Sequence, residues 1–307
     1  MKKMKKFLSL IGNDHYIIYL FHGVIPQLSR KSIRNYNRKH ILVEEFDWLI
    51  KNLMRTGNPI DLRQLLRVCD SGKILPKRSF SITFDDGFLN NYAFAAPILR
   101  FYGCPATFYL ASSFVNSNLM SWVDRIEHAV DKTDKKNIFF KGQHYSLITN
   151  DKKIIFMEEV RKTLKTCVYK DLNEEATKIQ RVLIGQEIFS LNDNLDAKMT
   201  WSHVRELCAE TLFNFGGHSH SHGILSHLKG KKLDFEIKKP LQTIHNECSI
   251  RTEHFSYPEG LDNHFNNRVV DVLKRSGVRC CPTAIHGFNN LTIKACGLFE
   301  LRRVSVI

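Results

Sequence analysis

The sequence predicts an α/β fold built on a mostly parallel β-sheet. Short runs of β-branched and aromatic residues alternate with segments whose apolar residues recur at helical spacing, a pattern typical of βαβ units. Acidic and histidine residues directly follow several of these runs, where open sheets and closed barrels both build their sites. With 307 residues, 43% apolar and 25% charged, the chain suits one large or two ordinary globular domains. An open doubly wound sheet and a closed barrel both fit this pattern.

The first part of the chain predicts three strands separated by helices. The expected elements are, in order, a strand at 16–21, helices at 43–55 and 61–68, a strand at 80–84, a helix at 91–102 and a strand at 106–110. The polar, basic stretch that ends at His40 predicts a long loop after the first strand. Asp61 is a typical N-cap residue, and Gly57 and Gly103 are expected to end two helices.

Residues 112 to about 200 interrupt this order and predict a mostly helical insertion or lid. The clearest helices within it are expected at 154–167 and 172–184. The alternation then resumes with a helix at 201–209, a strand at 212–215, a helix at 233–251, a strand at 254–257, a helix at 263–276 and a strand at 278–283. The predicted division is a basic N-terminal tail at 1–15 and a single domain at 16–307, with the insertion at about 125–195.

The charge of the chain is strongly positive, with 45 Lys and Arg against 31 Asp and Glu, a formal net charge of +14. Such an excess suits nucleic acid, an anionic membrane surface, an anionic substrate or a coat of solvated lysines. The sequence contains no zinc-finger or RNA-recognition signature, and no basic helix interleaved with aromatic residues. Nucleic acid is therefore not an expected partner.

The N-terminus and the cysteines predict a cytoplasmic protein. The lysine-rich start is followed by a short apolar stretch at 7–11, which is too short for the apolar region of a signal peptide. The eight cysteines are scattered without a CxxC pair, which favours reduced thiols over disulfides or a cysteine-ligated zinc site. Residues 1–11 are expected either to lie on an anionic membrane face or to form a disordered tail.

The first chemical motif is Thr83-Phe84-Asp85-Asp86-Gly87, at the end of the predicted second strand. Adjacent side chains at a strand end point to different sides, so one carboxylate can bind a metal while the other faces a bound water. Two close carboxylates repel each other unless a cation offsets their charge. Taken alone, an Asp-Asp-Gly sequence is more often a surface turn.

The second motif places three histidines in five residues, His218-Ser219-His220-Ser221-His222, after another strand. Two imidazoles and one carboxylate with an open position form a known catalytic zinc arrangement. In a helical turn His218 and His222 face the same way, whereas in an extended strand all three histidines align. The spacing alone does not choose between these geometries, or exclude a polar loop.

The third motif, Phe255-Ser256-Tyr257-Pro258-Glu259-Gly260, also follows a predicted strand. Pro258 and Gly260 mark a fixed turn, and Tyr257 can line a groove. An ordinary βα turn explains this motif equally well. Trp122, with Asp124-Arg125 just after the third strand, could line a substrate groove, or Trp122 could anchor the insertion as a buried aromatic residue.

Together the three motifs resemble the polysaccharide deacetylases, the carbohydrate esterase family 4 or NodB-homology group. The family pattern T-F-D-D-G, then H-[S/T]-x-x-H, then a Pro-containing turn before Gly, is similar to residues 83–87, 218–222 and 255–260, in that order. The segment at 19–24 resembles the first-strand YHGV of one subgroup, and 200–207 resembles the lead-in to the histidine motif. The resemblance leaves much of 125–195 unexplained. It implies a distorted (β/α) barrel with a mostly helical insertion.

The resemblance also implies roles for individual residues. Asp86, His218 and His222 would be the metal ligands, most simply of Zn²⁺, with Co²⁺ or another divalent ion as alternatives. Asp85 would be the catalytic base, and His22 would be the general acid that protonates the leaving amine, for which a pKa near neutral is suitable. The substrate-binding residues are expected to be Tyr257, Pro258, Gly260, Trp122 and Arg303.

Two positions depart from the family pattern. The family's third motif often carries an Arg that orients the base, but this chain has Ser256 there, and either Arg302 or Arg303 could substitute. Glu259 replaces a usual aromatic residue. These changes affect the expected substrate preference and orientation of the base more than the metal site.

The expected function is metal-dependent removal of the N-acetyl group from an amino sugar of a bacterial surface glycan. The cytoplasmic prediction favours its lipid- or nucleotide-linked precursor over finished polymer. The alternatives are a same-fold amidase acting on a non-sugar C–N bond and a non-catalytic relative that binds membrane or nucleic acid. The expected partners are therefore an N-acetylated amino sugar and, through the basic N-terminus, the inner face of an anionic membrane.

Overall fold

The central sheet is mainly parallel and follows the order β10-β12-β1-β5-β6-β9 in the computed structural model, which describes residues 2–28, 32–166, 171–292 and 295–307. Its strands are β1 (His15–Phe21), β5 (Ser79–Phe84), β6 (Ala106–Leu110), β9 (Phe213–Gly217), β10 (Pro282–His286) and β12 (Leu301–Ser305). The short strand β4 (Asn58–Pro59) pairs with β5, and β11 (Asn289–Asn290) pairs antiparallel with β1. The predicted α/β class is confirmed.

The two ends of this strand order are joined by isolated parallel bridges. Gly217 of β9 pairs with Phe255, and His254 pairs with Cys280, which directly precedes β10. The pairing therefore returns on itself, as a distorted barrel requires. The predicted strand at 254–257 shrinks to these bridges because Pro258 has no N–H to donate and the backbone of Glu259 adopts a φ of +60°.

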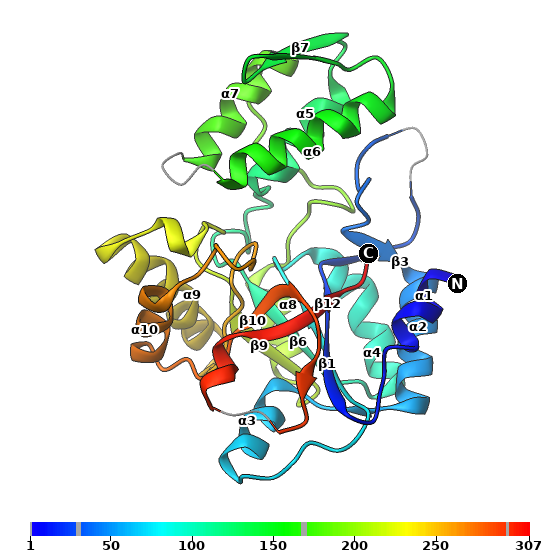
Figure 1. The fold of residues 1–307 in the computed structure, drawn as a ribbon, viewed down its shortest axis with the longest axis vertical. Helices are drawn as coiled ribbons and strands as arrows, with labels where there is room; N and C mark the ends of the chain where they lie inside the picture. Colours follow the sequence, from blue (N-terminus) through cyan, green and yellow to red (C-terminus); the bar gives the residue numbers. More distant parts are fainter. Residues whose placement is uncertain (1, 29–31, 167–170, 293–294) are drawn as a thin grey trace.

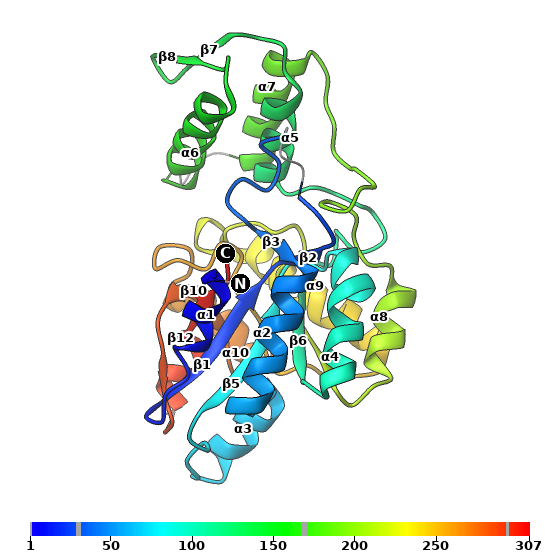
Figure 2. The ribbon, with the colours of Figure 1, turned by 90° about the vertical axis from the view of Figure 1, so that its right-hand side faces the viewer.

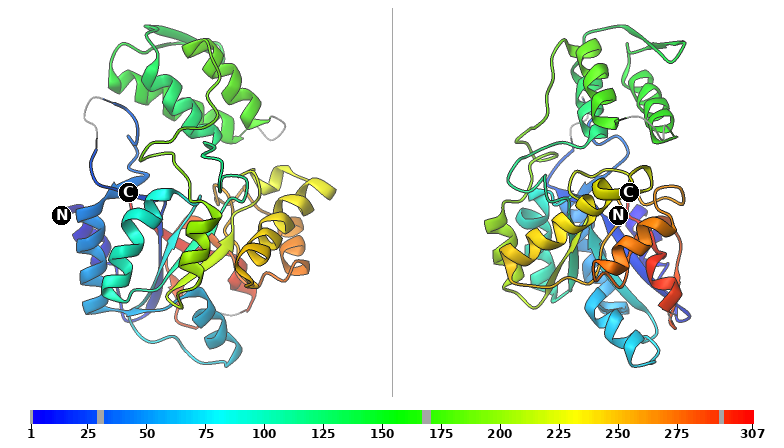
Figure 3. Two further views of the ribbon diagram at one scale, coloured as in Figure 1. Left: turned by 180° about the vertical axis from the view of Figure 1, so that it is seen from behind. Right: turned by 90° about the vertical axis from the view of Figure 1, so that its left-hand side faces the viewer.

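Helices cover the outer face of the strands, as the four ribbon views show (Figure 1, Figure 2 and Figure 3). They are α2 (Val43–Thr56), α3 (Leu62–Asp70), α4 (Ala96–Tyr102), α8 (Trp201–Cys208), α9 (Gly230–Cys248) and α10 (Asn267–Arg275). Asp61 caps α3 as predicted, accepting a 2.6 Å hydrogen bond from the Gln64 amide. A π-helical turn, Asn91–Ala95, precedes α4, which ends at left-handed Gly103.

Aromatic rings fill the space between the sheet and the helices. Phe84 of β5 stacks on Phe108 of β6 at 5.2 Å between centroids, and Phe108 stacks on Phe215 of β9 at 5.5 Å. These fully buried rings supply a large apolar area that stabilises the strand order. They therefore fix the spacing of the strand ends that carry the motifs.

The N-terminal segment is a helix, α1 (Lys2–Leu8), and not a disordered tail. Met4 and Phe7 are buried in the same apolar cluster as the sheet, and the Tyr19 hydroxyl donates to the Phe7 carbonyl at 2.8 Å. The apolar residues of this short segment pack into the protein interior, while Lys3, Lys5 and Lys6 stay exposed. In the described part of the chain, no helix combines the length and the apolar character needed to cross a membrane.

The insertion lies beyond one end of the barrel (Figure 1 and Figure 2). It comprises α5 (Trp122–Lys132), the hairpin β7 (Asn137–Phe140) and β8 (Gln143–Ser146), α6 (Asn150–Thr166) and α7 (Leu172–Ile184). Its own apolar cluster includes Ile126, Phe156 and Val160. The helix predicted at 154–167 begins four residues earlier, and Cys167 lies outside the described residues.

Six cysteines have described side chains, and all six are free thiols. Cys104, Cys280 and Cys281 are buried in apolar surroundings, and burial raises the pKa of each of these thiols. The side chains of Cys167 and Cys296 lie outside the described part. The thiols therefore act as small apolar residues of the core.

Candidate active site

Three motif-bearing segments meet at the carboxyl ends of the barrel strands, beneath the insertion. Asp85 and Asp86 follow β5, and His218 follows β9. His22 follows β1 and leads into the short strand β2 (Gly23–Ile25), which pairs with β3 (His40–Leu42). These residues line a cavity of about 340 Å³, which also contains His222, Tyr257 and Arg303.

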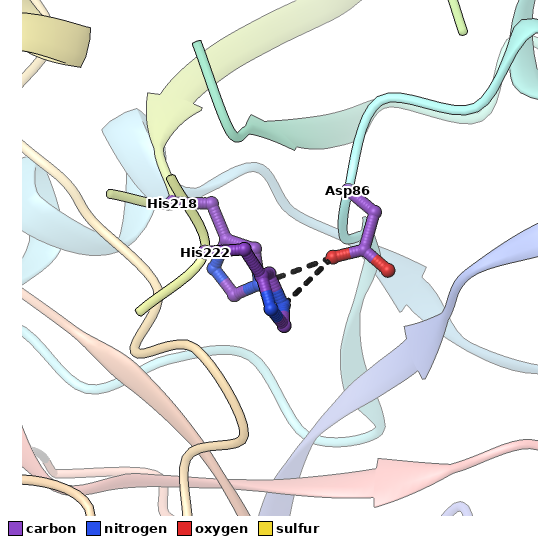
Figure 4. Close-up of side chains that lie close together, drawn as sticks. All are labelled: Asp86, His218 and His222. Atoms are coloured by element: carbon purple, nitrogen blue, oxygen red, sulfur yellow. Dashed lines mark ion pairs between the residues drawn. The ribbon is translucent and has the colours of Figure 1, made fainter. Parts of the chain in front are cut away.

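The side chains of Asp86, His218 and His222 converge on one point (Figure 4). Asp86 Oδ1 lies 3.4 Å from His218 Nε2 and 3.1 Å from His222 Nε2. Asp86 has a φ of +73° and His222 a φ of +57°, so both occupy left-handed conformations that L residues adopt only at a cost. The backbone is thus bent where it directs these two side chains inward.

The donor set fits a divalent metal ion. The Nδ1 of His218 lies 2.8 Å from the Ser256 carbonyl; donation there leaves Nε2 with its lone pair toward Asp86, as a metal ligand requires. Asp86 Oδ1 is buried and accepts no hydrogen bond of ordinary geometry from the described residues. Burial alone would raise the pKa of Asp86, but the neighbouring His222 and Lys39 hold it well below its ordinary value. A carboxylate kept ionised beside two imidazole nitrogens is suited to Zn²⁺ or a similar ion.

Asp85 is held by Arg303 in a bidentate pair. The Arg303 Nη1 and Nη2 atoms donate to the two carboxylate oxygens at 2.9 and 2.7 Å. Nη2 also donates to the Ser256 hydroxyl at 2.9 Å, which lies 3.4 Å from Asp85 Oδ2. Burial favours the neutral acid, yet the Arg303 charge outweighs it and lowers the pKa of Asp85 below its ordinary value.

Arg303 therefore makes the contact with Asp85 that is expected of the family's third-motif Arg, in whose place this chain has Ser256. It is fully buried and comes from β12, whereas Arg302 on the same strand is exposed. Alternation along a strand sends only one of two adjacent arginines to the interior. Arg303 contacts the carboxylate and not only the cavity, so its position is that of a residue that orients Asp85.

His22 is half-buried in the cavity wall. Burial lowers its pKa to about 4, although the charges of Asp86 and Asp85 oppose this shift. Its imidazole is therefore neutral near pH 7 in the resting protein. Desolvation disfavours the imidazolium more than the nearby carboxylates favour it, and the role of His22 as general acid stays a prediction.

Of the expected substrate-binding residues in the third motif, Tyr257 lines the cavity, whereas Pro258 and Gly260 shape the turn that follows it. The Tyr257 ring lines the cavity, but its hydroxyl donates to the Phe299 carbonyl at 3.1 Å and its ring stacks on Phe265. Pro258 and Gly260 form the turn behind it, and the Ala284 amide donates to the Gly260 carbonyl at 2.8 Å. A Cβ at position 260 would lie 2.7 Å from the Ala284 nitrogen, so this turn requires glycine.

Trp122 lies outside the metal cavity. It is buried in the apolar cluster of the insertion and borders a neighbouring cavity of about 440 Å³ that shares Ser121 and His222 with the first. Of the two interpretations of Trp122, its burial matches that of an anchor for the insertion.

Six further charged side chains line the cavity, and most of them carry no motif in the sequence. They come from the loop before β3, from α5 and α6, and from the third motif: Lys39, Asp124, Glu127, Arg161, Lys165 and Glu259. Lys39 Nζ lies 2.9 Å from Asp124 and 3.4 Å from Asp86, and Lys165 pairs with Glu259. Two of the six carried a signal in the sequence: Asp124, which lies close to Trp122 after the third strand, and Glu259, as a departure from the family pattern.

The fold and site together define a barrel whose strand ends hold paired carboxylates and two histidines, the groups that metal-assisted hydrolysis uses. The chain belongs to the polysaccharide deacetylase family, whose model matches residues 72–281. The chain is 30% identical over 120 residues to the Poly-beta-1,6-N-acetyl-D-glucosamine N-deacetylase of Escherichia coli (strain K12). That match covers 39% of this chain but only 17% of the relative's length.

Solved structures show the same fold. The Streptococcus pyogenes deacetylase PplD in complex with acetate gives a TM-score of 0.61 at 14% identity, covering 95% of this chain and 92% of that one. IcaB from Ammonifex degensii gives a TM-score of 0.56 at 14% identity, with the same coverages. At this level of identity the likeness establishes the fold alone.

Proposed function

We propose that this protein is a metal-dependent hydrolase that removes the N-acetyl group from an amino sugar of a bacterial surface glycan or of its lipid- or nucleotide-linked precursor. The observation that carries this proposal is the juxtaposition of two differently held carboxylates. Asp86 faces two histidine nitrogens, and adjacent Asp85 is held ionised by Arg303. Membership of the polysaccharide deacetylase family supports the reaction type.

Asp86, His218 and His222 would hold the metal ion, most simply Zn²⁺. When bound, such an ion polarises a carbonyl and lowers the pKa of a water molecule. Asp85, ionised and fixed by Arg303, accepts the proton of the attacking water. The low pKa of Asp85 keeps it in the basic form over the neutral range.

The backbone of the third motif supplies the remaining polar group. The described residues offer no hydrogen-bond acceptor to the Tyr257 amide, which leaves this N–H free to stabilise the oxyanion of the tetrahedral intermediate. His22 is neutral at rest, so it must first gain a proton during turnover before it protonates the leaving amine. Its place in the same cavity supports this assignment.

The substrate class rests on the cavity and on the relatives. A cavity of about 340 Å³ is at the lower end of the roughly 300–1,000 Å³ typical of small-ligand sites. The E. coli relative is named for N-acetylglucosamine in a polymer, which supports an N-acetylhexosamine here. The cytoplasmic location and a contact of the exposed α1 lysines with an anionic membrane belong to the same proposal.

The test is acetate release from N-acetylhexosamine substrates by purified protein of known metal content. We expect release that stops after chelation, returns with Zn²⁺ or Co²⁺, and is abolished in Asp85→Asn while the metal stays bound. Turnover of a cyclic imide or formamide without acetate release would indicate the amidase alternative. A protein that holds no divalent metal, and in which Asp86→Ala changes nothing, would overturn the enzyme proposal.

A further inference from the structure

Helix α6 of the insertion brings two basic side chains into the catalytic cavity. Arg161 and Lys165 both line it, together with the three metal-competent side chains. They are four residues apart, so they lie on the same face of the helix. Helix α6 therefore contributes two cations to the cavity, to which α5 contributes the carboxyl groups of Asp124 and Glu127.

The other cations that line the cavity are matched by carboxylates. Lys165 pairs with Glu259, Lys39 pairs with Asp124, and Arg303 pairs with Asp85. Each of these pairs leaves little net charge for a ligand. Among the residues that the structure describes, one cation of the cavity then has no carboxylate partner.

That cation is Arg161. Its hydrogen-bond partner in the described part of the chain is the neutral Tyr36 hydroxyl, 3.3 Å from Nη1. Two carboxylates of the cavity act on Arg161 by charge, Glu259 and Glu127. Glu127 accepts a hydrogen bond from the Asn35 amide at 2.9 Å and pairs with Arg34 at 3.4 Å. Glu259 is already neutralised by Lys165. A guanidinium has five donors, so most of those of Arg161 are available to a ligand in the cavity.

We propose that Arg161 binds a phosphate group of the substrate, so that the amino sugar is deacetylated while it is attached to a phosphate ester. A planar guanidinium donates two parallel hydrogen bonds to phosphate oxygens, which makes arginine the usual residue for this contact. The inference rests on the proposed function and specifies its substrate: a sugar phosphate or diphosphate, whose other end is a nucleotide or a lipid.

The experiment compares acetate release from N-acetylglucosamine 1-phosphate, UDP-N-acetylglucosamine, a prenyl diphosphate-linked N-acetylglucosamine in detergent, and a neutral N-acetylglucosamine oligomer. The measured quantity is the ratio of kcat/KM between each phosphorylated substrate and the neutral oligomer. Arg161→Gln is compared with Lys162→Gln, which removes the same charge from an exposed neighbour on α6 that does not line the cavity. Circular dichroism and metal content establish that both variants are folded.

We expect the wild-type ratio to exceed ten for at least one phosphorylated substrate, and the substrate with the highest ratio identifies the carrier. Arg161→Gln should lower this ratio at least tenfold, Arg161→Lys should lower it less, and Lys162→Gln should leave it within twofold. A wild-type ratio near one overturns the inference while leaving the proposed function intact. So does an equal loss in Arg161→Gln and Lys162→Gln.

Absence of acetate from every substrate would overturn the proposed function, and binding then decides the inference. Calorimetry with N-acetylglucosamine 1-phosphate and with N-acetylglucosamine measures affinity without turnover. Tighter binding of the phosphate form by wild type, lost at least tenfold in Arg161→Gln but not in Lys162→Gln, supports the phosphate contact. Equal affinity for the two sugars overturns it.

Discussion

The barrel and the insertion contribute to the same cavity in different ways. Each barrel group is fixed by the strand end that carries it, so Asp85, Asp86 and His218 are rigidly placed and almost fully buried. The insertion supplies the long, partly exposed side chains of Arg161 and Lys165 from α6, and the buried acids Asp124 and Glu127 from α5. Short side chains on strands suit chemistry that needs fixed geometry, whereas long cationic side chains suit recognition of a ligand.

Among substitutions in the barrel, those of the three proposed metal ligands should lower kcat/KM the most. His222→Gln removes one of three converging donors, so we expect loss of the bound metal and a fall in kcat/KM larger than the roughly 10–100-fold caused by loss of an outer hydrogen-bond partner. His220→Ala is the control, because His220 lies between the two ligands yet pairs with the Ser112 hydroxyl at 2.8 Å. Metal analysis and acetate release measure both variants. Metal loss in His220→Ala as well would contradict the assignment of ligands.

The difference between the two regions also explains what the sequence could predict. The barrel elements and the Asp86, His218 and His222 set were predictable because short motifs directly follow apolar strand runs, and strand ends meet at one edge. The choice of Arg303 over Arg302 as the partner of Asp85 was not, because the pair joins residues 218 positions apart and depends on which face of β12 is inward. Arg161 and Lys39 had no signal, because a basic residue in a basic chain looks the same on a solvated face and in a cavity.

Arg303 tests how strictly the barrel fixes its base. Arg303→Lys keeps the charge but loses the bidentate geometry, and we expect kcat to fall by about 10–100-fold through misplacement of Asp85. The pKa of Asp85 should rise, because Arg303 is the strongest of the charges that lower it. Asp85 works ionised, and that form is lost as pH falls through its pKa, so the acidic limb of the kcat/KM profile should move to higher pH.

Arg302→Lys is the matched control for this variant, since Arg302 is the exposed neighbour on β12. It should leave the pH profile of kcat/KM unchanged. A profile that moves equally in both variants would mean that the overall charge of the strand sets the pKa, and not the contact with Asp85.

The insertion has an apolar cluster of its own, so we expect that it can unfold locally while the barrel stays folded. Phe156 is fully buried there, against Phe140 and Tyr145, so Phe156→Ala should cost about 3–5 kcal/mol of local stability. Amide hydrogen exchange should accelerate over 122–184 while the barrel strands and the metal content are unchanged. Ile155→Ala, at a side chain that is 52% exposed, is the control. Faster exchange throughout the barrel would show that the two regions unfold as one unit.

Substitution of Glu127 should give the smallest of these effects, a change in the pH dependence of folding stability. It tests what it costs the folded protein to keep a charged carboxyl group buried at the cavity. Burial, with the nearby charge of Asp124, raises the pKa of Glu127 to about 7, although the Asn35 amide and the Arg34 and Lys39 charges oppose the shift. A carboxyl group whose pKa is raised in the folded state favours the folded protein less as pH rises above its ordinary value. That loss grows from about pH 4.5 and is complete above about pH 7.

Glu127→Gln is neutral at every pH and keeps an oxygen to accept from Asn35, so it should avoid this loss. We expect the free energy of unfolding of the variant to equal that of wild type near pH 4.5 and to exceed it by about 3 kcal/mol at pH 8, as the size of the pKa shift implies. Urea unfolding at the two pH values measures the difference. A variant less stable than wild type at pH 8 would contradict this expectation. It would mean that the ionised Glu127 carboxylate stabilises the folded protein through its pair with Arg34.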